Sequence, residues 1–110
     1  MIDETFSRIE ARLKSAGGLN PDSREELITL IGSLKTEVSE LAKNDAERAS
    51  DISRLTETSA TAATHDERDE KSVASATQSL ESTVQEFEAQ HPQLVERVNR
   101  LCVILSNMGI

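Results

Sequence analysis

Apolar residues recur at every third or fourth position along most of the chain, which is the spacing of one face of an α-helix. The first such stretch covers about residues 3–16 and stops before Gly17 and Gly18. Glycine adopts the left-handed backbone conformation that commonly ends a helix, so the pair marks a terminus. We therefore predict a short N-terminal helix whose buried face consists of Ile2, Phe6, Ile9 and Leu13.

The second stretch opens with Asn20 and Pro21, a favourable helix start. An asparagine side chain caps the first turn, and proline is tolerated at the first helical position, where its missing N–H would have no partner. The apolar residues that follow alternate at spacings of four and three, the pattern of a coiled-coil seam. They are Leu27, Ile31, Leu34, Val38 and Leu41. The pattern predicts one helix over about residues 21–56.

The seam of this second helix is interrupted by two charged residues. The same spacing falls on Asp45 and Arg48 and recovers at Ile52 and Leu55. A polar pair in a seam can fix the register of two helices at a cost in stability, or it can face solvent where the partner helix ends. Both interpretations are open from the sequence.

Residues 57–69 are dominated by serine, threonine, alanine and charged residues, without large apolar side chains. Tertiary packing of an apolar face supplies most of the stability of a helix. We therefore predict a flexible polar connection over this stretch. The alternative is a single very long helix, because the stretch contains no glycine or proline.

The apolar spacing returns from about residue 70. Its first part falls on Val73, Thr77, Leu80, Val84 and Phe87. Its second part falls on Leu94, Val98, Leu101, Leu105 and Met108. Pro92 lies between the two parts, and proline removes a backbone donor and disfavours helix at the residue before it. We predict helices over about 70–90 and 92–107, with a kink or break at His91 and Pro92.

These elements predict an all-α fold in a single helical domain, residues 1–110. Two arms of matched length, about 21–56 and 70–107, are joined by the polar connection. Arms of this kind pack as an antiparallel helical hairpin or a coiled-coil-like bundle. The short N-terminal helix would then fold back against the base of the hairpin.

A hairpin alone buries only one side of each helix. Apolar residues are left over at Ile28, Leu30, Val95 and Ile104. We therefore expect a homo-oligomer, in the simplest case a homodimer. The expected interaction seam is Leu27, Ile31, Leu34, Val38, Leu41, Leu80, Val84, Phe87, Leu94, Val98, Leu101 and Leu105.

The formal net charge of −8 at pH 7 narrows the range of partners. Nucleic acid is bound by clustered lysine and arginine side chains, and a cytoplasmic membrane surface is also negative, so we expect neither partner. Cys102 is the only cysteine, so no intrachain disulfide can form, which is usual in a reducing compartment. The longest apolar run, Leu101 to Leu105, is too short to cross a bilayer. We expect a cytoplasmic protein.

Glu88 and His91 have the i, i+3 spacing of ligands in carboxylate-bridged di-iron bundles. A complete site of that type needs a second such pair, which a homodimer would supply, and two further inward glutamates. In the simpler interpretation, His91 caps or packs locally before Pro92. We expect no metal site and no cofactor, and we name Glu88 and His91 as the candidate ligands if a site exists.

Other polar residues predict no catalytic site. His65 and Asp69 have metal-ligand spacing, but no apolar residues lie nearby in sequence to shape a pocket, which is typical of a solvated connection. Cys102 lies between Leu101 and Val103 without a base close in sequence. Such a cysteine usually behaves as a small buried hydrophobe rather than as a nucleophile.

Segments near both ends of the chain resemble a known family. They are Leu19-Asn-Pro-Asp-Ser-Arg-Glu-Glu-Leu27, Phe87-Glu-Ala-Gln-His-Pro-Gln-Leu94 and the terminal Leu105-Ser-Asn-Met-Gly-Ile110. These segments are similar to small bacterial proteins of the domain of unknown function 4404 family, whereas residues 56–72 are longer and less typical. The resemblance implies a bacterial, helix-rich protein in which Met108, Gly109 and Ile110 are ordered. It implies no activity, because the family has none assigned.

The function predicted from the sequence is that of a non-enzymatic protein–protein interaction or structural module that acts through its heptad seams. The alternative is a metal-binding or redox helical bundle that uses Glu88 and His91, with Cys102 as a further group.

Overall fold

The computed structural model describes residues 2–17, 19–65 and 67–108, and this part of the chain is helical without strands. The helices are α1 (Ile2–Ser15), α2 (Pro21–Ala42), α3 (Ala46–Thr64), α4 (Glu70–Gln85) and α5 (Pro92–Asn107). The all-α fold class predicted from the sequence is therefore confirmed. Gly109 and Ile110, which the family resemblance implied to be ordered, lie outside the described residues.

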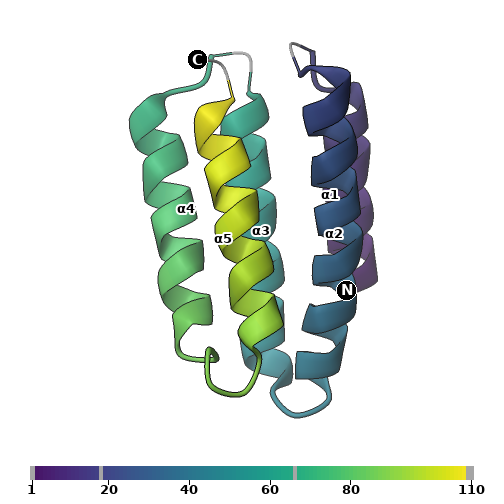
Figure 1. The fold of residues 1–110 in the computed structure, drawn as a ribbon, viewed down its shortest axis with the longest axis vertical. Helices are drawn as coiled ribbons and strands as arrows, with labels where there is room; N and C mark the ends of the chain where they lie inside the picture. Colours follow the sequence, from purple (N-terminus) through teal and green to yellow (C-terminus); the bar gives the residue numbers. More distant parts are fainter. Residues whose placement is uncertain (1, 18, 66, 109–110) are drawn as a thin grey trace.

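Helices α2 to α5 run alternately down and up and form a four-helix bundle (Figure 1). Each helix packs against the next one along the chain, and α5 returns to pack against α2, which closes the bundle. Helix α1 lies against α2 and α3, and α3 contacts all four other helices. The molecule measures 38 × 24 × 21 Å along its principal axes.

The apolar faces of the helices meet in one core. Its largest fully buried side chains are Phe6, Ile9, Leu13, Leu27, Ile31, Leu34, Leu41, Ile52, Leu80, Leu94, Leu101 and Leu105. Burying an apolar side chain of this size contributes about 1.5–3 kcal/mol relative to leaving it in water. The apolar spacing read along the sequence therefore marks the buried face of each helix.

The predicted single helix over 21–56 is wrong, because the chain turns at residues 43–45 between α2 and α3. Asp45 Oδ1 accepts a hydrogen bond from the Arg48 backbone N at 3.1 Å, so Asp45 caps the start of α3. The Arg48 side chain forms an ion pair with Glu86 at 2.7 Å. The interruption of the seam therefore marks a helix terminus. The long two-armed hairpin is replaced by an up-and-down bundle of shorter helices.

The predicted polar connection over 57–69 is also wrong for most of its length, because α3 continues to Thr64. Several small side chains in or just before this stretch are buried, namely Thr56, Ser59, Ala60 and Ala63. Helix α3 lies among the four other helices, and small side chains allow those helices to approach it closely. The Thr56 hydroxyl is satisfied locally, since it donates to the Ile52 carbonyl at 2.7 Å.

Helix α4 ends at Gln85, earlier than the predicted end at about residue 90. The chain then turns, and the His91 backbone N donates to the Phe87 carbonyl at 2.7 Å. His91 occupies the N-cap position of α5 and Pro92 its first turn, so the predicted interruption is a break between two helices. The predicted bounds of this last helix, 92–107, are confirmed.

Candidate functional site

The predicted interaction seam lies inside the molecule. Apart from Phe87, which is half-buried, its members are all buried: Leu27, Ile31, Leu34, Val38, Leu41, Leu80, Val84, Leu94, Val98, Leu101 and Leu105. These side chains belong to one core cluster within a single chain. A second protein therefore cannot contact them while the bundle stays folded.

The leftover apolar face is also mostly covered by the chain itself. Val95 is 6% exposed and Ile104 is 9% exposed, while Ile28 and Leu30 are half-buried. The exposed large hydrophobic side chain of the described residues is Val103, with 49% of its surface open to solvent. The apolar surface that a partner could reach is therefore centred on the last turns of α5.

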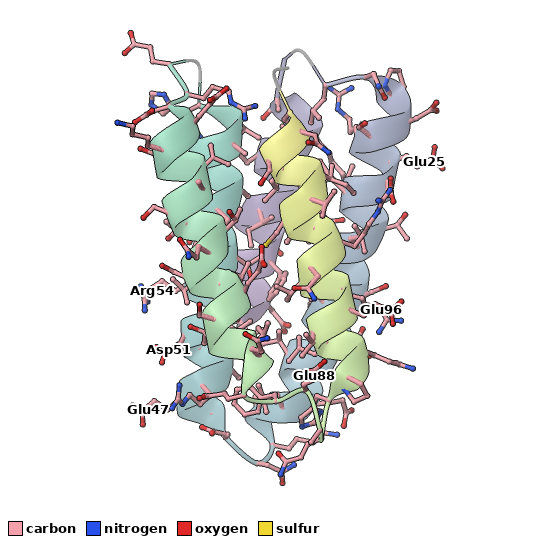
Figure 2. All side chains as sticks on the ribbon, turned by 60° about the vertical axis from the view of Figure 1, so that its left-hand side comes forward. Glu25, Glu47, Asp51, Arg54, Glu88 and Glu96 are labelled. Atoms are coloured by element: carbon pink, nitrogen blue, oxygen red, sulfur yellow. The ribbon has the colours of Figure 1, made fainter. Side chains whose placement is uncertain are left out.

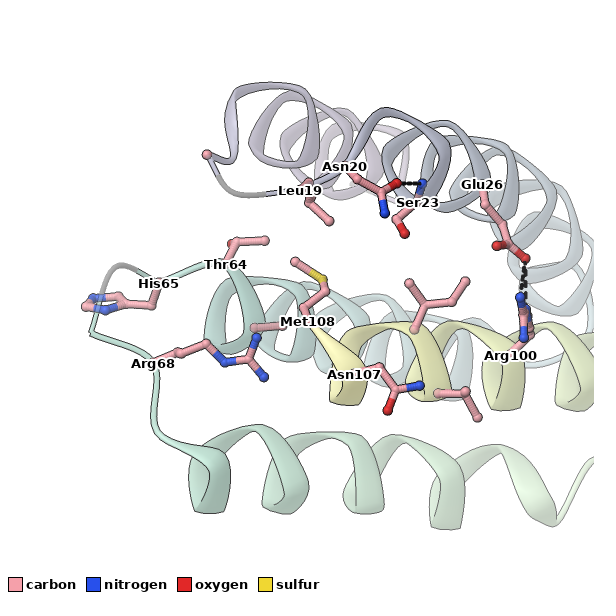
Figure 3. Close-up of a pocket in the computed structure, with 14 residues that line it drawn as sticks. Leu19, Asn20, Ser23, Glu26, Thr64, His65, Arg68, Arg100, Asn107 and Met108 are labelled. Carbon is pink, nitrogen blue, oxygen red and sulfur yellow. Dashed lines mark hydrogen bonds and ion pairs between the residues drawn. The ribbon is translucent and has the colours of Figure 1, made fainter. Parts of the chain in front are cut away.

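Val103 borders a cleft of about 570 Å³ at the end of the bundle where α5 finishes. Three parts of the chain build the cleft (Figure 3): the α1–α2 connection with the first turns of α2, the end of α3 with the connection that follows, and the last turns of α5. Apolar side chains line it at Leu19, Val103, Ile104 and Met108. Its volume lies in the range of about 300–1,000 Å³ that is usual for ligand pockets.

The local structure fixes one wall of this cleft. Asn20 Oδ1 accepts a hydrogen bond from the Ser23 backbone N at 2.8 Å, which starts α2 beside the cleft. On the opposite side Thr64 Oγ1 donates to the Ala60 carbonyl at 2.7 Å and accepts from Arg12 Nε at 2.8 Å. The start of α2 is therefore held by its own cap, and the end of α3 also by a contact with α1.

Among the described residues that line the cleft, the charged side chains are Glu26, Arg68 and Arg100. Arg100 Nη2 pairs with Glu26 Oε2 at 2.8 Å across the α2–α5 contact. His65 Nδ1 accepts a hydrogen bond from the Glu67 backbone N at 3.1 Å. The guanidinium of Arg68 has no ion pair or hydrogen bond with the residues that the structure describes, and Figure 3 shows it directed towards Asn107 and Met108.

The rest of the surface carries charges of both signs, such as Arg54, with acidic groups in excess. Glu25, Glu47, Asp51, Glu88 and Glu96 project into solvent from several helices and connections (Figure 2). They belong to a chain with a formal net charge of −8. Among the described residues, the Arg68 guanidinium is therefore a positive group without an ion-pair partner on a chain of negative net charge, with Glu67 and Asp69 close to it in sequence.

The candidate metal ligands Glu88 and His91 lie in the α4–α5 connection at the opposite end of the bundle. The Glu88 side chain is exposed, and the His91 ring packs edge-on against Phe87 with their centroids 6.3 Å apart. In the described part of the chain, no three His, Cys, Asp or Glu side chains are grouped so that they could hold a metal ion. The structure thus shows a local packing role for His91.

Cys102 is buried, and its Sγ lies 3.8 Å from the carbonyl oxygen of Thr77. Burial, with a smaller effect of the nearby Glu81 carboxylate, raises the pKa of the thiol to about 12. The thiol is therefore protonated at neutral pH, and the thiolate is the form that reacts with electrophiles and binds metals.

A second, smaller cavity of about 430 Å³ lies where α1 begins, beside the end of α2 and the start of α3. Its lining is formed by Ile2, Asp3, Ser39, Ala42, Ala46 and Ser50. None of these residues is a half-exposed large apolar side chain, and none carries a positive charge. We therefore take the cleft beside Val103 as the candidate site.

Periodicity along the sequence does not reveal this cleft. Leu19, Arg68 and Val103 belong to three segments that meet only in the folded chain. The available signal is that Val103 and Ile104, apolar residues of α5 that line the cleft, lie off the heptad spacing.

Comparison with known proteins assigns part of the chain to a family. The model of a family described as a domain of unknown function (DUF4404) matches residues 46–110. The match includes residues 56–72 and the whole of α3, α4 and α5, while α1 and α2 lie outside it. No curated protein and no solved structure matches the chain. Within the described helices, none is long and apolar enough to span a bilayer.

Proposed function

The chain belongs to the family described as a domain of unknown function (DUF4404), and we propose that it is a cytoplasmic, non-enzymatic protein–protein interaction module that binds a partner at the cleft beside Val103. The observation that carries this proposal is the position of Val103. Its side chain is half exposed in the lining of a 570 Å³ cleft, whereas the heptad seams are buried in the core.

Physical arguments favour a protein partner at this position. Protein interfaces combine a small apolar centre with a polar rim, and arginine is enriched in them. Val103 and Met108 would provide the apolar centre, and Arg68, Arg100 and Asn107 the rim. A partner that covers Val103 removes apolar surface from water, which favours formation of the complex.

The homodimer predicted from the sequence rested on apolar faces that a two-armed hairpin would leave open. Val95 and Ile104 of that face are covered by the chain itself, so this argument for a second copy no longer applies. The proposal therefore does not include the homodimer. Static light scattering decides the point, by comparing the measured mass with the 12.1 kDa of one chain.

The proposal is tested by photo-crosslinking in the native host. Val103 is replaced by p-benzoylphenylalanine, and Ser82, an exposed residue of α4 outside the cleft, is replaced in a control strain. We expect a defined protein to be captured at position 103 and to be missing from the control.

The captured protein is then purified, and its affinity is measured against the unmodified chain and the Val103→Ser variant. We expect binding to weaken at least about threefold, because the lost apolar contact is worth roughly 1 kcal/mol. Capture of the same proteins at both positions, no capture at either, or equal affinity of the two chains would contradict the proposal.

A further inference from the structure

We propose that the cleft beside Val103 binds a short acidic and apolar segment of the partner protein. Arg68 would pair with a carboxylate of that segment, while Val103 and Met108 contact its apolar side chains. This inference rests on the proposed function and adds the chemistry of the partner.

Charge complementarity is the first argument. Of the cationic side chains in the cleft, Arg100 is already paired with Glu26, the acidic residue among the described lining. The Arg68 guanidinium has no such partner in the described part of the chain. A guanidinium presents parallel N–H donors that match a carboxylate, so an acidic side chain is the group that complements it best.

The arrangement of apolar groups is the second argument. Leu19 approaches the cleft from the α1–α2 connection, and Met108 lies between it and Arg68 (Figure 3). Apolar side chains and the unpaired cation therefore lie within one cleft rather than on separate faces. A ligand that fills it must carry apolar and negatively charged groups close together, as an extended segment rich in leucine and glutamate does.

The negative net charge of the chain favours binding of an acidic segment at the cleft over binding elsewhere on the surface. A net charge of −8 repels an acidic segment from most of the surface. Screening in physiological salt limits that repulsion to roughly 8 Å, so contacts within the cleft decide the affinity. A basic segment would be attracted to the outer surface in general, but it would meet a like charge at Arg68.

The probe for the test is an octapeptide that alternates leucine and glutamate, with fluorescein at its N-terminus and an amide at its C-terminus. Its binding to the full chain is measured by fluorescence anisotropy, and the binding position by backbone amide shifts in NMR spectra. A second peptide carries lysine in place of each glutamate. We expect the acidic peptide to bind and to shift the amides of Val103 and Met108.

Two charge-reversal variants distinguish a contact within the cleft from the effect of the overall charge of the protein. Arg68→Glu should weaken binding of the acidic peptide at least about tenfold, since a charge-assisted contact is lost and a repulsion is added. Lys71→Glu makes the same change of charge three residues further on, at an exposed position outside the cleft lining. We expect this control to change the affinity by less than about twofold. Arg68→Glu should also bind the lysine peptide more tightly than the original chain does.

Each other outcome overturns the inference. Equal binding of the acidic peptide to the original chain and to Arg68→Glu removes the assigned role of Arg68. If no peptide binds although position 103 still captures a protein, the partner chemistry is wrong and the interaction module stands. If crosslinking fails as well, the proposed function fails. A dimer that Val103→Ser dissociates and Arg68→Glu leaves intact would identify a second copy of this chain as the occupant.

Discussion

Cys102 shows how packing determines the chemistry of a single residue. The side chain faces the core on α5, and burial raises the pKa of its thiol to about 12, from an ordinary value of 9.0. In the unfolded chain the thiol ionises at the lower pH. Between pH 9 and 12 the unfolded chain therefore loses this proton while the folded chain keeps it. The resulting stabilisation of the folded state is complete below pH 9 and declines as the pH rises towards 12.

A comparison of pH profiles tests this consequence. Above pH 9 the unfolding free energy of the original chain should fall by up to about 1.4 kcal/mol per pH unit more than that of Cys102→Ala. The measurement is urea unfolding followed by circular dichroism at a series of pH values. Parallel profiles of the two proteins would show that the folded thiol ionises as readily as the unfolded one.

Asp45 illustrates, at the scale of the element, why the sequence predicted some helix bounds and not others. The start of α5 could be predicted, because proline restricts its own backbone and that of its neighbour. An aspartate at a seam position has two physical meanings: it can be a destabilised core residue, or it can begin a new helix by accepting a backbone hydrogen bond. Sequence spacing does not distinguish these two, and the structure shows the second.

The cap at Asp45 can be tested by mutation. Asp45→Ala should lower the unfolding free energy by about 1 kcal/mol, within a usual range of about 0.5–2 kcal/mol, because the Arg48 backbone N–H loses its acceptor. The control is Glu47→Ala, an exposed acidic residue in the same first turn, for which we expect less than about 0.5 kcal/mol. Equal effects of the two substitutions in denaturant unfolding would argue against a capping role.

Helix α3 shows a second limit of the sequence pattern. Small residues are usually interpreted as solvent-exposed or flexible, since they bury little apolar area. In the second half of α3 they are buried at Ser59, Ala60 and Ala63, on a helix that packs against four others. The number of neighbours of a helix is a property of the folded chain, so the pattern of residues 57–64 did not indicate it.

This interpretation of α3 predicts the result of enlarging a side chain. Ala60→Leu should destabilise the protein by about 1–3 kcal/mol, because Ala60 is 1% exposed and added methyl groups must displace neighbouring helices. Thr58→Leu, at an exposed position of the same helix, should have less than about 0.5 kcal/mol of effect. Thermal and urea unfolding provide the measurement. A neutral Ala60→Leu would mean that this stretch is loosely packed.

The four-helix bundle as a whole is closed by its most distant contact. Neighbouring helices in the bundle are mostly consecutive in the chain, whereas the α2–α5 contact joins segments far apart. Arg97 Nη1 pairs with Glu37 Oε1 at 2.8 Å across it, over a separation of 60 residues, and both side chains are partly buried. Contacts between consecutive helices can form while this contact is still open, because their loops are shorter.

Kinetics should reveal this order of formation. Glu37→Gln removes the charge from a partly buried pair worth about 0.5–1 kcal/mol. If α2 and α5 meet after the transition state, the substitution raises the unfolding rate about two- to fivefold and leaves the folding rate unchanged. Glu40→Gln serves as the control, since Glu40 pairs with Lys43 three residues away on the surface. Stopped-flow measurements that show slower folding for Glu37→Gln would reverse the order.

The position of the cleft on this last seam has a consequence for the lifetime of the folded chain. Its walls belong to both sides of the α2–α5 contact, with Glu26 on one side and Arg100 and Val103 on the other. A ligand that touches both walls can bind only after α2 and α5 have packed together, so it would hold these two helices in contact. It would hardly speed up folding, but it would delay opening, and a loaded protein would resist proteolysis for longer than an empty one.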